Sequence, residues 1–328
     1  MKQQRQLNIE LLHVLCMLFI VTGHISNIEN LPSYMVSFNT IAPHAVDCFI
    51  LISGFFLINS KFKTERILRT IISTISLSFI VTLVLYLSKL ANLTSLFKSL
   101  APIYCYWFIN KYIAVLILSP FINKVCNSIT KKQFQILIVS LLLLSSQFFV
   151  FFPFGKIYGD GISLIWMITM YITGGYLRLY TPKFKYWGTV TLILIIIYNF
   201  CYIYLYGIIM VWNNSLITYI LSITTFMWFK NLTISNDGFI PKMIMFIAPN
   251  TLAVYIIHSH PYVTTHLMQA FNRFMGPIPV FLYLYLFSSI VFIASVIIDK
   301  IRLYIFQYTG IDNLIGKTAT RLNQLYEE

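Results

Sequence analysis

Charged side chains are scarce in this sequence. They make up 10% of its 328 residues, whereas 58% of the residues are hydrophobic, and the mean hydropathy is +0.78. Soluble domains are about half apolar and about a quarter charged, so this composition excludes a soluble globular protein and indicates an integral membrane protein. Sustained strand-like alternation is missing as well, which excludes a membrane barrel. A cleavable signal is not expected, because the first apolar run is too long for one.

Cysteine pairs with a metal-binding or redox spacing are also missing. All five cysteines lie in or beside apolar segments, and none forms a CxxC pair. A free cysteine in such a setting is a small apolar side chain. The sequence therefore predicts neither a disulfide framework nor a metal site.

What the sequence does contain is a series of long apolar runs. Each is about 18 to 23 residues long, the length at which a helix crosses a hydrocarbon core of about 30 Å. They predict an all-α fold, a polytopic membrane helix bundle of about ten transmembrane helices. The predicted spans are 9–26, 41–59, 68–88, 103–123, 133–152, 161–180, 186–206, 210–229, 244–264 and 279–298.

The basic residues gather on one side of these spans. Most of the 23 Lys and Arg residues fall in the loops that share a side with the N-terminus, and such loops are cytoplasmic. Both termini are therefore predicted to be cytoplasmic, and the net charge of +13 reflects topology and no nucleic-acid partner. Since the loops are short, residues 1–300 are predicted to form one transmembrane domain, and residues 301–328 a cytoplasmic tail that is amphipathic or disordered.

The first span carries two histidines, His13 and His24. An ionisable side chain inside a membrane is costly unless it has a partner or a function, so both are candidate site residues. Eleven residues of helix bring them back to within about 20° of each other around the axis. They share one helix face, with His13 at the cytoplasmic end and His24 at the outer end.

Other polar residues are predicted to lie in the outer layer with His24. Asp47, near the start of the second span, either pairs with this histidine or bonds backbone N–H groups or water as a helix-start carboxylate. His258, and with it His260, reaches the outer half from the ninth span, either as part of the site or as a satisfied bundle residue. Trp107, Asn110 and Lys111 enter at the start of the fourth span. Lys111 either contacts the substrate or snorkels to the interface.

A basic pair, Arg66 and Arg69, opens the third span on the cytoplasmic side. A spacing of three residues puts both on one helix face, where two guanidinium groups can hold a phosphate-bearing cofactor. The alternative is that they are topological charges, since basic residues collect on that side in any case.

Taken together, these segments resemble the acyltransferase 3 family, ten-helix membrane proteins that O-acylate cell-surface polysaccharides. The resemblance covers nearly the whole chain, and the order and spacing of its pieces carry it. Those pieces are NIELL and GH in the first span, VDCFILISGFF in the second, the Arg-x-x-Arg at Arg66 and Arg69, YWFINKYIAVLILSPFIN in the fourth, YITGGYLR around Gly174 and Gly175, and LAVYIIHSHP in the ninth.

The resemblance implies transfer of an acyl group, usually acetyl, from cytoplasmic coenzyme A to a hydroxyl outside the membrane. His24 then corresponds to the catalytic histidine, with Asp47 and His258 beside it, and Arg66 and Arg69 look like contacts for the phosphates of coenzyme A. Trp107, Asn110 and Lys111 are the expected substrate contacts. One position departs from the family pattern: His13 stands where the family has an arginine, which is always charged.

We therefore expect an O-acetyltransferase of a bacterial plasma membrane, a multi-pass protein with acetyl-CoA as acyl donor and no metal. Its acceptor is expected to be a polysaccharide or a lipid-linked glycan precursor, and its other partners membrane lipid and either a second copy or polysaccharide-synthesis machinery. Two alternatives stay open. Polar residues in a helix bundle also suit a transporter or flippase, and His13 could mark a catalytically altered scaffold member.

Overall fold

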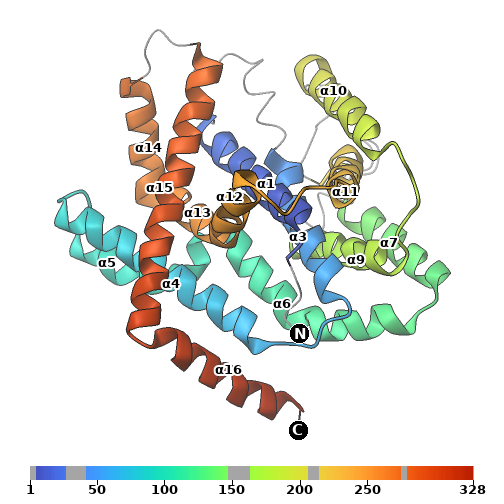
Figure 1. Ribbon diagram of the computed structural model, residues 1–328, viewed down its shortest axis with the longest axis horizontal. Helices are drawn as coiled ribbons and strands as arrows, with labels where there is room; N and C mark the ends of the chain where they lie inside the picture. Colours follow the sequence, from blue (N-terminus) through green and yellow to red (C-terminus); the bar gives the residue numbers. More distant parts are fainter. Residues whose placement is uncertain (1–4, 27–41, 147–162, 206–213, 275–278, 328) are drawn as a thin grey trace. The chain divides into compact units, whose positions relative to one another are not determined.

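The computed structural model describes residues 5–26, 42–146, 163–205, 214–274 and 279–327. Within these ranges the secondary structure is helical, with no strand (Figure 1). The prediction of an all-α fold is therefore confirmed. By compactness the chain divides into two units, 1–60 with 118–248 and 61–117 with 249–328, and each is described by itself.

The first unit is built around helix α3, which packs against α1, α9 and α11. The remaining helices attach to these: α7 packs on α9, α10 on α11, and α12 on α1. The helices of this unit are α1 (Leu7–Ser26), α3 (Ala42–Leu57), α7 (Lys131–Ser145), α9 (Leu164–Leu179), α10 (Trp187–Leu205), α11 (Leu216–Lys230) and α12 (Phe239–Ile247).

Two glycines bring α3 and α9 into direct backbone contact. A Cβ atom on Gly54 would lie 1.9 Å from the backbone oxygen of Tyr171, and a Cβ atom on Gly174 would lie 2.0 Å from that of Leu51. Small residues at facing positions are the usual means of close helix packing in membranes. The local sequence therefore dictates how these two helices cross.

Hydroxyl side chains fix where several helices of this unit begin. Ser163 accepts a hydrogen bond from the backbone N–H of Trp166 at the start of α9, and Ser215 caps α11 in the same way. Thr130 and Gln133 form a reciprocal capping box at the start of α7. Each cap satisfies a backbone N–H that has no partner within its own helix.

In the second unit α13 packs against both α4 and α15, while α16 lies along α4 after the chain turns at the end of α15 (Figure 1). The short α5 and a 3-10 helix, η1, also pack on α4. The elements are α4 (Thr64–Leu87), α5 (Leu93–Lys98), η1 (Pro102–Cys105), α13 (Thr251–His258), α14 (Pro261–Phe274), α15 (Val280–Tyr308) and α16 (Ile311–Glu327). Helix α6 (Trp107–Ser128) begins in this unit and ends in the other.

Five described helical segments are long and apolar enough to cross a membrane, and three shorter apolar helices accompany them. The chain is thus a multi-pass membrane protein. The five are Leu7–Ser26, Thr64–Leu87, Trp107–Ser128, Phe239–His258 and Val280–Tyr308, and the shorter ones are His44–Leu57, Trp187–Phe200 and Leu216–Lys230.

Two predicted boundaries differ from the structure. The ninth span, expected as one helix over 244–264, consists of α12 and α13 joined by the 3-10 turn η2 (Ala248–Asn250), and it ends at His258. Proline explains both interruptions, because Pro249 lies in η2 and Pro261 begins a new helix, α14. At the C-terminus, α15 continues to Tyr308, beyond the predicted end of the tenth span at 298.

Candidate active site

His24 lies in the last turn of α1, in the first unit, and its side chain is half-buried. The two hydroxyls next to it along the helix are both engaged with backbone carbonyls of α1. Thr22 donates to Leu18 over 2.8 Å and Ser26 donates to Gly23 over 2.9 Å. The imidazole is therefore the titratable group at this end of the helix.

Asp47 is buried in α3 and is held by an indole that the sequence did not single out. Its Oδ1 accepts a hydrogen bond of 2.9 Å from Nε1 of Trp166. Trp166 is itself fully buried in the first turn of α9, beside the Ser163 cap. No motif marks Trp166, because it meets Asp47 across 119 positions of sequence. The pairing of Asp47 with His24 stays a prediction.

His13, at the other end of α1, lies beside Glu10 as expected. Its Nδ1 is 3.5 Å from a carboxylate oxygen of Glu10, which also pairs with Arg5 at 3.7 Å. The ring stacks on Phe49 of α3, with 5.3 Å between the centroids. His13 is therefore held between a carboxylate and an aromatic ring at the start of α1.

Two further cations of the first unit share a single aromatic ring. The guanidinium of Arg178 lies 5.1 Å from the centroid of Phe55, and the ammonium of Lys230 lies 5.7 Å from it. Among the residues that the structure describes, neither side chain pairs with a carboxylate. No sequence pattern marks this pair, because the two residues lie at the ends of different helices, α9 and α11.

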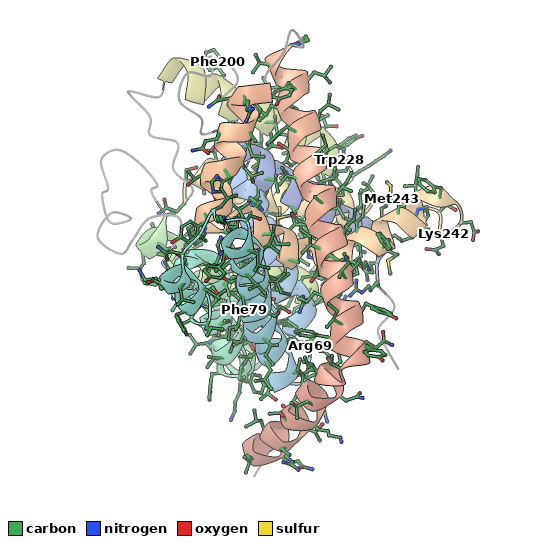
Figure 2. The ribbon with its side chains drawn as sticks, turned by 90° about the vertical axis from the view of Figure 1, so that its left-hand side faces the viewer. Arg69, Phe79, Phe200, Trp228, Lys242 and Met243 are labelled. Atoms are coloured by element: carbon green, nitrogen blue, oxygen red, sulfur yellow. The ribbon has the colours of Figure 1, made fainter. Side chains whose placement is uncertain are left out.

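In the second unit, Arg66 and Arg69 lie in the first two turns of α4, as predicted. Arg69, labelled in Figure 2, is engaged with two carboxylates. Its Nε donates to Glu65 over 2.8 Å, and its Nη1 donates to Asp312 of α16 over 2.8 Å. Hydrogen bonds from Thr64 to Asn323 dock α16 at the same place. A phosphate at Arg69 must therefore share or displace these acidic partners.

A buried ion pair lies close to Arg69. Arg302 of α15 donates from Nε to Asp299 over 2.8 Å, while its Nη2 is 2.7 Å from the same oxygen. Both side chains are about 5% exposed or less. They line a cavity of about 220 Å³ together with Arg69 and Asp312. The sequence places Asp299 three residues before Arg302 on one helix face, but the burial of the pair depends on the packing of α15.

His258 is buried at the end of α13 in the second unit. Its Nδ1 donates to the backbone carbonyl of Val254 over 2.6 Å, and its Nε2 lies 3.2 Å from the hydroxyl of Ser259. The carbonyl can only accept, so in the neutral ring Nδ1 carries the proton and Nε2 is the acceptor. The imidazole edge also contacts Tyr255 at 6.0 Å between ring centroids.

The three predicted substrate residues open α6, also in the second unit. Trp107 is half-buried against Phe108, Lys111 is half-buried, and Asn110 is exposed. Phe108 continues the contact to Tyr255 of α13, with 5.5 Å between the ring centroids. An aromatic row thus connects the start of α6 with the helix that carries His258.

The predicted site residues divide between the two units. His13, His24 and Asp47 belong to the first, and Arg66, Arg69, Trp107, Asn110, Lys111 and His258 belong to the second. In the described part of the chain, no three side chains of His, Cys, Asp or Glu gather as metal ligands. The candidate functional groups in each unit are therefore imidazole, carboxylate and guanidinium side chains.

A family model described as an acyltransferase domain matches residues 6–300, nearly the whole chain. The matched range contains every site residue predicted from the sequence. No curated protein and no solved structure matches the chain.

Proposed function

Because this chain belongs to the acyltransferase 3 family, we propose that it moves an acetyl group from cytoplasmic acetyl-CoA to a hydroxyl of an extracytoplasmic polysaccharide or of its lipid-linked precursor. The observation that carries the proposal is the family match over residues 6–300, which includes His24 on a helix of membrane length. We place the protein in a bacterial plasma membrane with about ten spans and both termini in the cytoplasm, since its basic loops lie on one side.

His24 is proposed as the catalytic residue. It either takes the proton from the acceptor hydroxyl or carries the acyl group transiently. In the first case, the hydroxyl oxygen forms a bond to the thioester carbonyl carbon, the carbon–sulfur bond breaks, and the proton passes from His24 to the leaving thiolate. Atoms and charge balance without a metal or a redox partner.

Two residues are proposed to support this histidine. Asp47 orients the imidazole through a carboxylate whose own position is fixed by the Trp166 indole. His258 presents Nε2 as an acceptor, because its Nδ1 proton is committed to the backbone of α13. Each is held by a contact within its own unit, which is the property that a positioned acid–base group requires.

Donor binding is proposed to use the basic residues near the predicted cytoplasmic ends of the helices. Arg66 and Arg69 contact the phosphates of coenzyme A, and His13 takes part from the start of α1. Arg178 and Lys230 support this assignment, since they supply positive charge in the first unit, where His13 stands in place of an arginine. Trp107, Asn110 and Lys111 are proposed to contact the acceptor.

The test uses purified protein, acetyl-CoA labelled in the acetyl group, and unacetylated polysaccharide from cells that lack the protein. We expect label to pass to the polysaccharide, and His24→Ala to reduce that transfer by about a hundredfold to ten-thousandfold, the loss typical of a removed catalytic base. A wild-type protein that binds no donor and transfers no label, but whose loss stops polysaccharide export, would support the transporter alternative. Transfer that survives His24→Ala would exclude the assigned mechanism.

A further inference from the structure

The second unit contains a cavity of about 170 Å³ that none of the roles above uses. It lies between the C-terminal half of α4, the α5–η1 segment and the turn that joins α13 to α14. On the topology predicted from the basic loops, this end of the unit faces away from the cytoplasm. The residues that line the cavity are Ser78, Thr82, Ser95, Lys98, Ser99, Pro102, Cys105, Tyr106, His260, Pro261 and Tyr262.

The lining is rich in buried hydroxyl groups and contains one buried imidazole. His260 is 3% exposed, Thr82 is fully buried, and Tyr106 is 1% exposed. Among the described residues of the lining, Lys98 is the one permanently charged side chain. Aromatic and proline walls with a few placed polar groups are typical of sites for small organic ligands.

The hydrogen bonds around His260 fix its tautomer. The Thr82 hydroxyl donates its single proton to the backbone carbonyl of Ser78 over 2.8 Å. Toward His260 it can therefore only accept, so Nε2 of His260 is the donor in the 3.0 Å contact between them. Burial lowers the pKa of His260 to about 4, and the ring is neutral near pH 7. Its Nδ1 is then a bare acceptor.

That acceptor is left without a partner. Nδ1 of His260 is buried and makes no hydrogen bond within the described part of the chain. The Tyr106 hydroxyl is buried too and forms no well-aligned hydrogen bond there, although Ser78 is its neighbour. Burial raises the pKa of Tyr106, so this hydroxyl keeps its proton and can donate it. Buried polar groups are normally satisfied, and here the two residues that carry a lone acceptor and a donor both line the same cavity.

A hydroxylated ligand matches these groups. One hydroxyl can donate to Nδ1 of His260, another can accept from Tyr106, and the tyrosine and proline walls offer apolar surface to a ring. The Ser95 and Tyr262 hydroxyls, which hydrogen-bond each other, extend the polar lining. An anionic phosphate is less suited, because Nδ1 of the neutral ring offers it no proton.

We propose that this cavity binds the sugar that receives the acyl group, with His260 accepting a hydrogen bond from one of its hydroxyls and Tyr106 donating to another. The proposal rests on the proposed acyltransferase function and adds a binding site for its acceptor. His260 is in this account a residue that positions the acceptor, while His24 keeps the chemistry.

His260→Gln tests the proposal with little change in shape. The glutamine amide N–H can take over the bond to Thr82, but nothing replaces the acceptor at the Nδ1 position. We expect the KM for unacetylated polysaccharide to rise about tenfold, the effect of one lost hydrogen bond, with a smaller change in kcat, because His260 positions the acceptor and takes no part in the chemistry. Tyr106→Phe should act in the same direction. His266→Gln, the same substitution on α14 outside the cavity, should leave KM unchanged.

Chemical labelling of Cys105 reports directly on whether a ligand occupies the cavity. It lines the cavity and is exposed, whereas Cys16, Cys48 and Cys126 are buried. In a Cys201→Ser background, a membrane-impermeant maleimide should label Cys105 in intact cells that lack the polysaccharide, and added polysaccharide should slow that labelling several-fold. Unchanged labelling together with an unchanged KM in His260→Gln would overturn the proposal and leave a water-filled cavity. That result leaves label transfer by the wild-type protein intact, whereas failure of the proposed function removes it.

Discussion

The helices within each of the two units are held together by different kinds of contact. In the first, Gly54 and Gly174 let the backbones of α3 and α9 touch, and added side-chain atoms have nowhere to go. In the second, charged side chains contact neighbouring helices: Arg302 of α15, buried against Asp299 of the same helix, reaches Ser76 of α4, and Arg69 of α4 reaches Asp312 of α16. The first unit should therefore be sensitive to volume and the second to charge. His24, the residue proposed to be catalytic, lies in the unit with the stricter packing.

The largest effect is expected from Gly174→Val. A Cβ atom at this position meets the Leu51 backbone at 2.0 Å, so α3 and α9 must separate, and we expect a loss of more than about 4 kcal/mol in unfolding free energy. Thermal unfolding in detergent measures it. The control is Gly316→Ala in α16, where a Cβ atom meets nothing within 4 Å; this change should stabilise the helix by up to about 1 kcal/mol. A tolerated Gly174→Val would remove the contrast between the units.

A smaller but still large effect is expected in the second unit from Arg302→Met. It leaves the Asp299 carboxylate buried without its partner, which typically costs about 3–5 kcal/mol. Combining it with Asp299→Leu removes both charges, and stability should return to within about 1–2 kcal/mol of the wild type. Thermal unfolding of the two single variants and the double variant gives the coupling. Additive losses would show that the pair acts through packing and not through charge.

The smallest effect on stability is expected from Asp312→Asn, because the Arg69 side chain is 45% exposed and exposed ion pairs contribute about 1 kcal/mol or less. Its effect on donor binding should be clearer. Without one of its two acidic partners, Arg69 can better attract a phosphate, so the KM for acetyl-CoA should fall about threefold.

A matched variant separates charge from helix docking at this position. Asn323→Ala removes the hydrogen bonds between α16 and Thr64 and changes no charge. It should leave the KM for acetyl-CoA unchanged. An equal fall in both variants would mean that the docking of α16, and not the charge of Asp312, controls donor access.

Much of the fold could be predicted because hydropathy is a local signal. Long apolar runs gave the helices, and the membrane-length helix with His24 in its last turn is where the sequence put it. The contact between His13 and Glu10 was also predictable, since three residues of helix bring the two together. Both predictions concern residues that are close in sequence, and both depend on a single helix.

What could not be predicted depends on packing between distant segments. Asp312 reaches Arg69 across 243 positions, and Trp166 reaches Asp47 across 119. Neither pair leaves a pattern in the sequence. The break between α12 and α13 did have a signal in Pro249, but the apolar run around it hid the interruption. The hydroxyl-lined cavity was missed because its residues come from four separate elements.

The proposed role of His24 in acyl transfer can be tested by one measurement in cells. The O-acetyl content of the surface polysaccharide is compared between cells with the wild-type protein and cells with His24→Ala at equal protein levels. We expect the O-acetyl groups to disappear in the variant while the amount of exported polysaccharide stays the same. Polysaccharide that keeps its O-acetyl groups in the variant would contradict it.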